Sequence, residues 1–342
     1  MAIILDADSG ESKTYTGYLE HRLFLALAEQ LPDKTFLHPA GSLKSLYAIP
    51  NLQAIDYLPV KGIFKQQKTE KWLKEHDVTA FISFRKTLAT RQPVRQVLLI
   101  SSEKWFNKSA LLNATDIGFT LDYLRKIFVK KYLADAKKHF TLQGILSKIA
   151  SSTTADMIKN SFTDGRDFFI CTDFELRKET LIILLKAFSA FKRMLQSSWK
   201  LMVVLRSADA VNPAEAGRIL ANYKYREDVV ITDDRALADK IAASYALITL
   251  NRENVYPVAV AEAIELNIPV IAVPNNAVKD IYNDALIYAP AETHEAVGEM
   301  LMMIYKAEAY RNELIKKMNS RPRLPGMGTL VQELKTHLTG IL

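Results

Sequence analysis

Apolar runs of strand length alternate with helical segments over residues 168–288, and this rhythm constrains the fold more than any other feature. The runs read FFICT, LMVVL, DVVIT, YALITL, PVIAV and LIYA. Helices are expected between them at 179–195, 214–223, 235–243 and 259–266. Strands that are apolar on both faces, each followed by a helix, indicate a parallel sheet covered on both sides.

The first half of the chain shows the same elements with a weaker rhythm. Strands are expected at 2–7, 34–37, 54–58, 78–84 and 94–101, and a leucine-rich helix at 18–31. The 342 residues suffice for two domains with separate cores. A polar interval at 151–167 is the expected linker. We therefore predict an α/β chain with domains at 1–150 and 151–320, and a C-terminal tail and helix at 321–342 that cross back to the first domain.

The composition is that of a folded, water-soluble protein. Hydrophobic residues make up 49% and charged residues 24% of the chain. A long apolar span and a signal-peptide pattern are both lacking, so a cytoplasmic location is expected. Cys171 lies in an apolar run and is predicted to be a small buried core residue rather than a reactive thiol. The six histidines show no ligand spacing, so no metal site is expected.

Positive charge is concentrated in the first half. Residues 1–160 carry 23 Lys and Arg against 15 Asp and Glu, a net +8, whereas the remainder carries 22 against 23, a net −1. Lysines and aromatic residues mix in two segments, 61–74 and 123–138, which are predicted to be helices. Such helices either lie on an acidic membrane or pack on their own domain with the lysines in water. No nucleic-acid-binding motif accompanies the charge, so no nucleic acid partner is expected.

The end of the first strand carries a pair of acids, Asp6 and Asp8. This spacing resembles that of haloacid-dehalogenase-like phosphatases, in which case Asp233 and Asp234 could supply metal-binding acids. Turn-forming aspartates at strand ends are the alternative. The loop that follows, ending at Gly17, precedes a helix, and it is either an anion site or an ordinary turn.

One segment carries a more specific resemblance. Residues 254–263 read NVYPVAVAEA, and residues 267–272 read NIPVIA. They resemble the donor-sugar loop of GT-B glycosyltransferases of family four, with its Glu-x7-Glu pattern. Glu262 matches the second acid, whereas the first falls on Asn254.

The resemblance implies two facing Rossmann-like, doubly wound parallel-sheet domains. The first would be the acceptor side and the second would bind the nucleotide sugar. It also implies a retaining, metal-independent transfer from a nucleotide-diphosphate sugar to an anionic or lipid-linked acceptor in glycan or cell-envelope polysaccharide synthesis, with no other cofactor. Glu262 would hold the ribose, the backbone at 254–257 the sugar and phosphate, and basic residues the diphosphate. The expected donor-binding residues are Gly17, Arg177, Lys178, Arg206, Asn254, Val255, Tyr256, Pro257 and Glu262. The resemblance does not assign a catalytic residue.

The chain also departs from the family pattern. The Gly-Arg pair of the donor site is replaced by Thr172-Asp173, and a carboxylate there would repel a diphosphate. The acceptor-side histidine is replaced by Ser101-Ser102. These departures keep a second function open, a catalytically inactive glycosyltransferase-like protein that binds or regulates an active partner.

Overall fold

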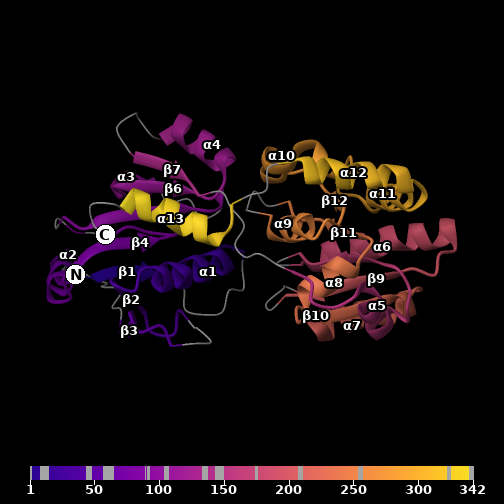
Figure 1. Cartoon of the computed structure of the whole chain (residues 1–342), viewed down its shortest axis with the longest axis horizontal. Helices are drawn as coiled ribbons and strands as arrows, with labels where there is room; N and C mark the ends of the chain where they lie inside the picture. Colours follow the sequence, from indigo (N-terminus) through magenta and orange to yellow (C-terminus); the bar gives the residue numbers. More distant parts are fainter. Residues whose placement is uncertain are drawn as a thin grey trace. The chain divides into compact units, whose positions relative to one another are not determined.

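The computed structural model divides into two compact units. One comprises Met1–Ser147 together with Leu324–Leu342, and the other comprises Lys148–Arg323 (Figure 1). The structure describes residues 2–7, 15–43, 48–56, 65–88, 90, 93–103, 108–132, 138–142, 150–173, 176–206, 211–252, 257–321 and 325–338.

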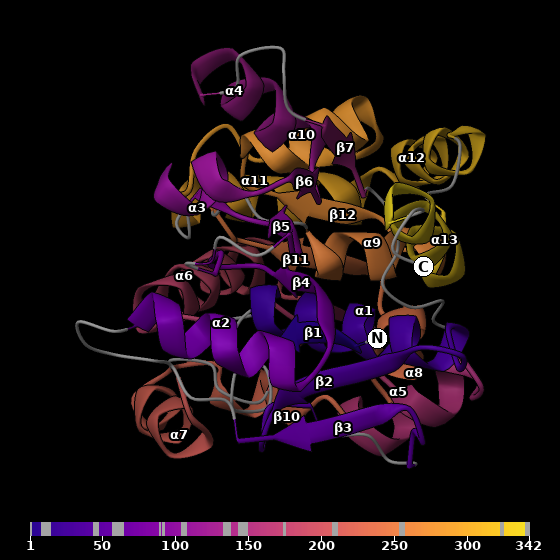
Figure 2. The ribbon, with the colours of Figure 1, turned by 90° about the vertical axis from the view of Figure 1, so that its left-hand side faces the viewer.

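The first unit is built on a parallel sheet in which seven strands are described. Its order is β3-β2-β1-β4-β5-β6-β7, which Figure 2 shows from bottom to top. The strands are β1 (Ala2–Asp6), β2 (Thr35–Pro39), β3 (Leu52–Ile55), β4 (Val78–Ser83), β5 (Arg95–Ile100), β6 (Asp116–Phe119) and β7 (Lys138–Thr141). The chain moves outward from β1 to β3 and returns on the other side of β1 at β4. The switch point of this sheet therefore lies between β1 and β4.

Helices flank this sheet, and the last helix of the chain is among them. They are α1 (Tyr15–Gln30), α2 (Lys65–Glu75), α3 (Lys108–Asn113), α4 (Asp122–Tyr132) and α13 (Met327–Leu338). Helix α13 packs beside α1 (Figure 1). The ring of His337 stacks on Phe140 with centroids 4.0 Å apart, and Arg95 donates a 2.6 Å hydrogen bond to the His337 carbonyl. These contacts join the C-terminal helix to the first unit.

The second unit repeats the plan with six described parallel strands in the order β10-β9-β8-β11-β12-β13. They are β8 (Phe168–Cys171), β9 (Lys200–Leu205), β10 (Val229–Asp233), β11 (Ala246–Thr249), β12 (Val270–Ala272) and β13 (Ile287–Tyr288). The helices are α5 (Ala155–Thr163), α6 (Lys178–Leu195), α7 (Pro213–Ala221), α8 (Leu237–Ala243), α9 (Val258–Glu265), α10 (Asn276–Tyr282), α11 (His294–Lys306) and α12 (Glu308–Ser320), with 3-10 turns at Arg226–Asp228 and Asn283–Ala285. The switch point lies between β8 and β11.

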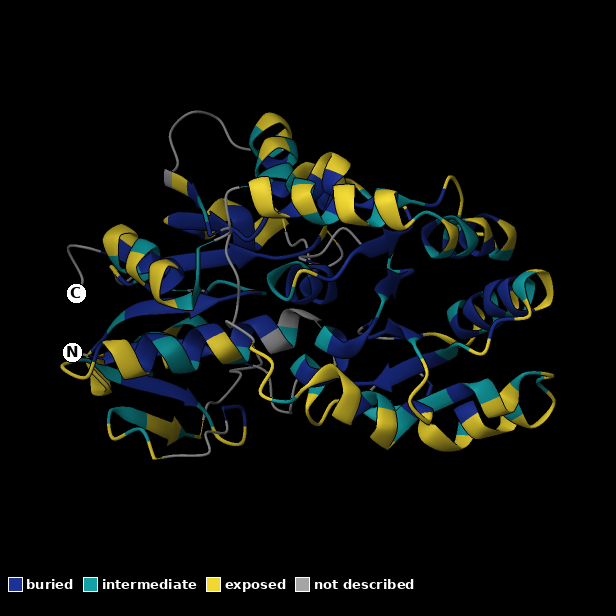
Figure 3. Ribbon diagram, turned by 45° about the vertical axis from the view of Figure 1, so that its right-hand side comes forward, coloured by how far each residue is buried: buried dark blue, intermediate teal, exposed yellow. Residues whose placement is uncertain are grey.

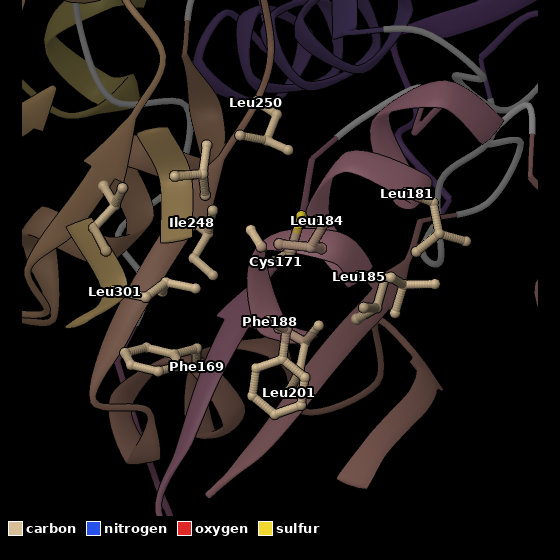
Figure 4. Close-up of a cluster of buried hydrophobic side chains, with 14 of the residues drawn as sticks. Phe169, Cys171, Leu181, Leu184, Leu185, Phe188, Leu201, Ile248, Leu250 and Leu301 are labelled. Carbon is tan, nitrogen blue, oxygen red and sulfur yellow. The ribbon is translucent and has the colours of Figure 1, made fainter. Parts of the chain in front are cut away.

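The core of the second unit lies between α6 and the sheet (Figure 4). Leu181, Leu184, Leu185 and Phe188 recur at helical spacing, so one face of α6 is buried. Phe169 on β8 belongs to the same cluster, and its ring packs edge-on against Phe191 of α6 with centroids 5.2 Å apart. Cys171 is buried in the same cluster, which confirms the prediction of a core cysteine.

Burial follows the expected layering. The strands of both sheets are mostly dark blue, whereas the outer faces of the helices are yellow (Figure 3). The predicted class, two doubly wound parallel-sheet α/β units, is confirmed by the parallel pairing in both sheets. Among the described residues, no helix is long and apolar enough to cross a lipid bilayer.

Three local predictions were wrong. The basic helix expected at 123–138 ends at Tyr132, and Lys138 begins β7. The expected linker at 151–167 contains helix α5, because Ile158 and Thr163 become buried and the helix packs on α8. Helix α1 begins at Tyr15 instead of residue 18, so Gly17 lies in its first turn and not in the loop before it.

Candidate functional site

The switch point of the second sheet holds a buried carboxylate, that of Asp173. Asp173 follows β8 and is 5% exposed. Its oxygens accept hydrogen bonds from the Thr249 hydroxyl at 2.5 Å and the Leu250 backbone N–H at 2.7 Å, at the end of β11. Burial raises the pKa of Asp173 above its ordinary value of 3.8, although these bonds and the charge of Arg206 act in the opposite direction.

A buried ion pair lies on the neighbouring strand. Arg206 follows β9, and its Nη2 donates to Oε2 of Glu262 on α9. The side chains are 5% and 6% exposed. Charges buried to this degree require an opposite partner, because the transfer of each ion out of water costs on the order of several kcal/mol. The sequence indicated both residues as separate donor contacts, and the structure joins them in one pair.

Helix α9 brings Glu262 to this position. Its residues from Val258 to Ala263 are all buried, since the helix is apolar around most of its circumference. Pro257 is buried and stands at the N-cap of the helix. The predicted residues Asn254, Val255 and Tyr256 lie outside the described residues. The first turn contains no acid, so the positive end of the helix dipole has no carboxylate from this turn beside it.

Two exposed cations stand at the start of α6, directly after β8. Arg177 is the N-cap residue, with extended backbone angles of φ −89° and ψ 156°, and Lys178 is the first helical residue. Positive charge is unfavourable at a helix N-terminus, because the dipole is already positive there. Glu179 offsets part of this charge. An anion bound at this helix start would be stabilised by the cations and the backbone N–H groups together.

A second polar cluster occupies the switch point of the first sheet. Asp6 at the end of β1 accepts a 2.8 Å hydrogen bond from the Ser83 hydroxyl at the end of β4, and it lies 3.0 Å from the Lys86 ammonium. Arg85 binds both oxygens of Glu20 on α1, at 2.7 and 2.8 Å. The sequence indicated only Asp6 among these residues. Its partner Asp8 lies outside the described residues.

The first-unit cluster also shows what sequence reasoning missed. The predicted strand at 78–84 is followed or ended by three polar residues, Ser83, Arg85 and Lys86. Polar residues at the ends of parallel strands gather at one edge of the sheet, and this rule would have indicated all three. Gly17 lies one turn before Glu20 on α1. Within the described ranges, no group of three or more His, Cys, Asp or Glu side chains is placed to hold a metal ion.

The whole chain is similar to solved GT-B structures. HepE from Anabaena, solved with UDP and glucose, aligns at a TM-score of 0.72 and 11% identity over 99% of this chain and 100% of that one. WaaG, a glycosyltransferase involved in lipopolysaccharide biosynthesis, aligns at 0.70 and 15% over 99% of each chain. A protein from Listeria monocytogenes described as a putative UDP-N-acetylglucosamine 2-epimerase aligns at 0.63 and 12% over 99% and 96%.

These likenesses establish the fold of the chain. It has the GT-B fold, as the sequence resemblance implied. No protein-family model and no curated protein matches the sequence. Since the same fold carries both a transferase and an epimerase description, function has to be argued from the site.

Proposed function

We propose that the protein is a glycosyltransferase that transfers a sugar from a nucleotide-diphosphate sugar with retention of configuration and without a metal ion. The observation that carries this proposal is the start of α6, where Arg177 and Lys178 meet a helix N-terminus directly after the central strand β8. A diphosphate offers the negative charge that this arrangement favours. The complex of HepE with UDP and glucose gives the donor class in a protein of the same fold.

The remaining donor residues take the roles that the family resemblance implies. Glu262 would accept hydrogen bonds from the ribose. The N-terminal end of α9, with Pro257 and the preceding residues Asn254, Val255 and Tyr256, would hold the sugar and phosphate. Gly17, in the first turn of α1, is the residue of the first unit proposed to let the donor approach the helix backbone, because glycine carries no side chain there.

For the acceptor and the location, only a general class is proposed. WaaG acts in lipopolysaccharide biosynthesis, and the first half of this chain carries a net charge of +8. We propose an anionic or lipid-linked acceptor in cell-envelope polysaccharide synthesis, and peripheral contact of a cytoplasmic protein with acidic membrane through the basic first unit. The outer faces of the helices are exposed (Figure 3), and Lys68, Lys71 and Lys74 of α2 and Lys126, Lys130 and Lys131 of α4 are among the exposed residues.

The first experiment is a thermal-unfolding screen with uridine, guanosine, adenosine and thymidine diphosphate sugars. A donor at about one hundred times its dissociation constant should add about 2.7 kcal/mol to the free energy of unfolding. The double variant Arg177→Gln, Lys178→Gln should lose most of the shift. Lys306→Gln with Lys316→Gln removes the same charge from exposed positions on α11 and α12 and should keep it.

Turnover separates the two functions that the sequence left open. Hydrolysis of the sugar from the bound donor, with release of the same anomer and in the presence of a chelator, is the expected result. Binding without turnover, with acceptors present, would favour the alternative, a catalytically inactive partner or regulator. The replacement of the Gly-Arg pair by Thr172-Asp173 is the observation that supports this alternative.

A further inference from the structure

We infer that Arg206 is a positioning residue, which fixes Glu262 for a nucleotide ribose, and is not a cation that binds the donor phosphates. This assignment rests on the proposed function and deepens it. Position alone had favoured a phosphate contact, because Arg206 stands at the carboxyl end of a strand that faces the expected ligand edge. The structure gives its guanidinium a partner inside the protein.

Arg206 Nη2 donates to Glu262 Oε2, and both side chains are almost fully buried. The pair joins the end of β9 to the second turn of α9. A guanidinium is planar, so the hydrogen bond from Nη2 restricts the orientations open to the carboxylate. An ionised carboxylate can accept hydrogen bonds from hydroxyl groups with both of its oxygens, and an adjacent arginine favours the ionised form.

The positive charge of Arg206 acts on Asp173 as well as on Glu262, since it lowers the pKa of Asp173 against the larger effect of burial. The charge of one guanidinium therefore acts on two carboxyl groups within the protein. A diphosphate would have to compete with both for this charge. Arg177 and Lys178, at the start of α6, are exposed to solvent, whereas Arg206 is buried.

Glu262 lies in apolar surroundings on its own helix. The five other buried residues of α9 are valine or alanine, which offer a ligand no polar side chain. An unpaired carboxylate in this helix would be neutralised by burial. The guanidinium of Arg206 supplies an opposite charge to the carboxylate at this position.

The test compares ligands that differ by one ribose hydroxyl. UDP, GDP and ADP, their 2′-deoxy counterparts and inorganic pyrophosphate would be titrated by calorimetry against the wild type, Arg206→Met, Glu262→Gln and the double variant. The wild type should favour the preferred ribonucleotide over its deoxy form by about 10- to 100-fold, the value of a hydrogen bond to a charged group. Each single variant should reduce this ratio to about 2-fold or less. The double variant should show no smaller ratio than the single variants, because both substitutions remove the same interaction. The affinity for pyrophosphate should stay unchanged in all three variants.

Two controls separate positioning from a general loss of structure. Arg206→Lys keeps the charge but not the planar fork, and should lower the ribose discrimination while preserving pyrophosphate affinity. Arg95→Met removes the partner of a buried carboxylate in the first unit. In the wild type, Arg95 Nε and Nη2 donate to Asp116 Oδ2 and Oδ1 at 2.6 and 2.9 Å. It should lower the melting temperature and leave the ribose discrimination intact.

The outcomes are distinguishable. If Arg206→Met weakens pyrophosphate and both nucleotides equally and keeps the ribose discrimination, Arg206 is a phosphate cation and the positioning role is wrong. If the wild type binds no nucleotide, the proposed function fails, and this assignment fails with it. Loss of ribose discrimination in Arg206→Met and Glu262→Gln, but not in Arg95→Met, supports the assignment.

Discussion

The carboxylate of Asp173 and the hydroxyl of Thr249, 2.5 Å apart, connect the two strands that flank the switch point of the second sheet. Asp173 follows β8 and Thr249 ends β11, which are hydrogen-bonded neighbours. Ligands of doubly wound sheets bind at such a point. The same carboxyl group accepts a hydrogen bond from the Leu250 N–H. Protonation of Asp173 is therefore coupled to the backbone hydrogen bonding at the end of β11.

Replacement of Asp173 by Asn should change how stability depends on pH. Burial raises the pKa of Asp173 above 3.8 in the folded protein, so the folded state binds this proton more tightly than the unfolded state does. The free energy of unfolding contributed by this group is therefore present below pH 3.8 and falls as the pH rises through the raised pKa. The free energy of unfolding would be measured with urea between about pH 4 and pH 8. It should show this decline in the wild type relative to Asp173→Asn. Parallel curves would contradict it.

Gly118 on β6 should not tolerate a side chain. A Cβ atom there would lie 2.6 Å from Leu99 Cδ2 and 2.8 Å from Phe140 Cε2. Gly118→Ala should therefore lower the free energy of unfolding by about 1–3 kcal/mol, the cost of overpacking a core.

The matched control is Gly217→Ala on α7, where nothing lies within 4 Å of the added atom. Alanine is the better helix former, so this variant should gain about 0.5–1 kcal/mol. Chemical denaturation of both variants in one buffer gives the comparison. A stable Gly118→Ala protein would show that the side chains of Leu99 and Phe140 can move aside.

Asp239 on α8 should hold the chain segment before α5 in place. Its Oδ1 accepts hydrogen bonds from the N–H groups of Ser152 at 2.6 Å and Thr153 at 3.0 Å, and from the Ser151 hydroxyl at 2.9 Å. Asp239→Ala should lower stability by about 1 kcal/mol, because water can satisfy these exposed groups in part. Limited proteolysis should cut earlier near residues 150–154.

The same contact predicts an acid dependence. Burial raises the pKa of Asp239, but the hydrogen bonds from Ser151, Ser152 and Thr153 outweigh it and leave the pKa below 3.8. The contribution to stability is then present above pH 3.8 and is lost as the pH falls through the lowered value. Asp234→Asn, on the exposed turn before α8, makes the same charge change and should affect neither readout.

Membrane contact should depend on the exposed lysines of α4. Leu124 and Phe128 of this helix are buried in the first unit, so the lysines rather than an apolar face would meet the lipid. Replacing Lys126, Lys130 and Lys131 by Gln should cost about 1 kcal/mol for each residue, or about 100-fold in binding overall, to vesicles with acidic lipid. Sedimentation at low and high salt measures this.

The charge-matched control is Lys186→Gln, Lys306→Gln and Lys316→Gln, which changes exposed lysines of the second unit. It should sediment like the wild type. If neither protein sediments with acidic vesicles, the proposed peripheral membrane contact is wrong, whereas the donor-binding proposal is unaffected.

The sequence by itself determined the strands and most helices of the second unit. Strands buried on both faces must be apolar along their length, so β8, β9 and β11 are visible as local runs. In the first unit the short strands β6 and β7 were missed. They have four residues each and include charged residues, Asp116 and Lys138, so no local pattern marks them.

Only the tertiary structure decided the contacts of the candidate site. Glu262 was predicted by resemblance and Arg206 by its place after a strand, yet their ion pair spans 56 positions of the chain. Asp173 and Thr249 are 76 positions apart. Which strand ends meet depends on the order of strands in the sheet. That order follows from helices crossing back to either side of the first strand, and no local sequence pattern records it.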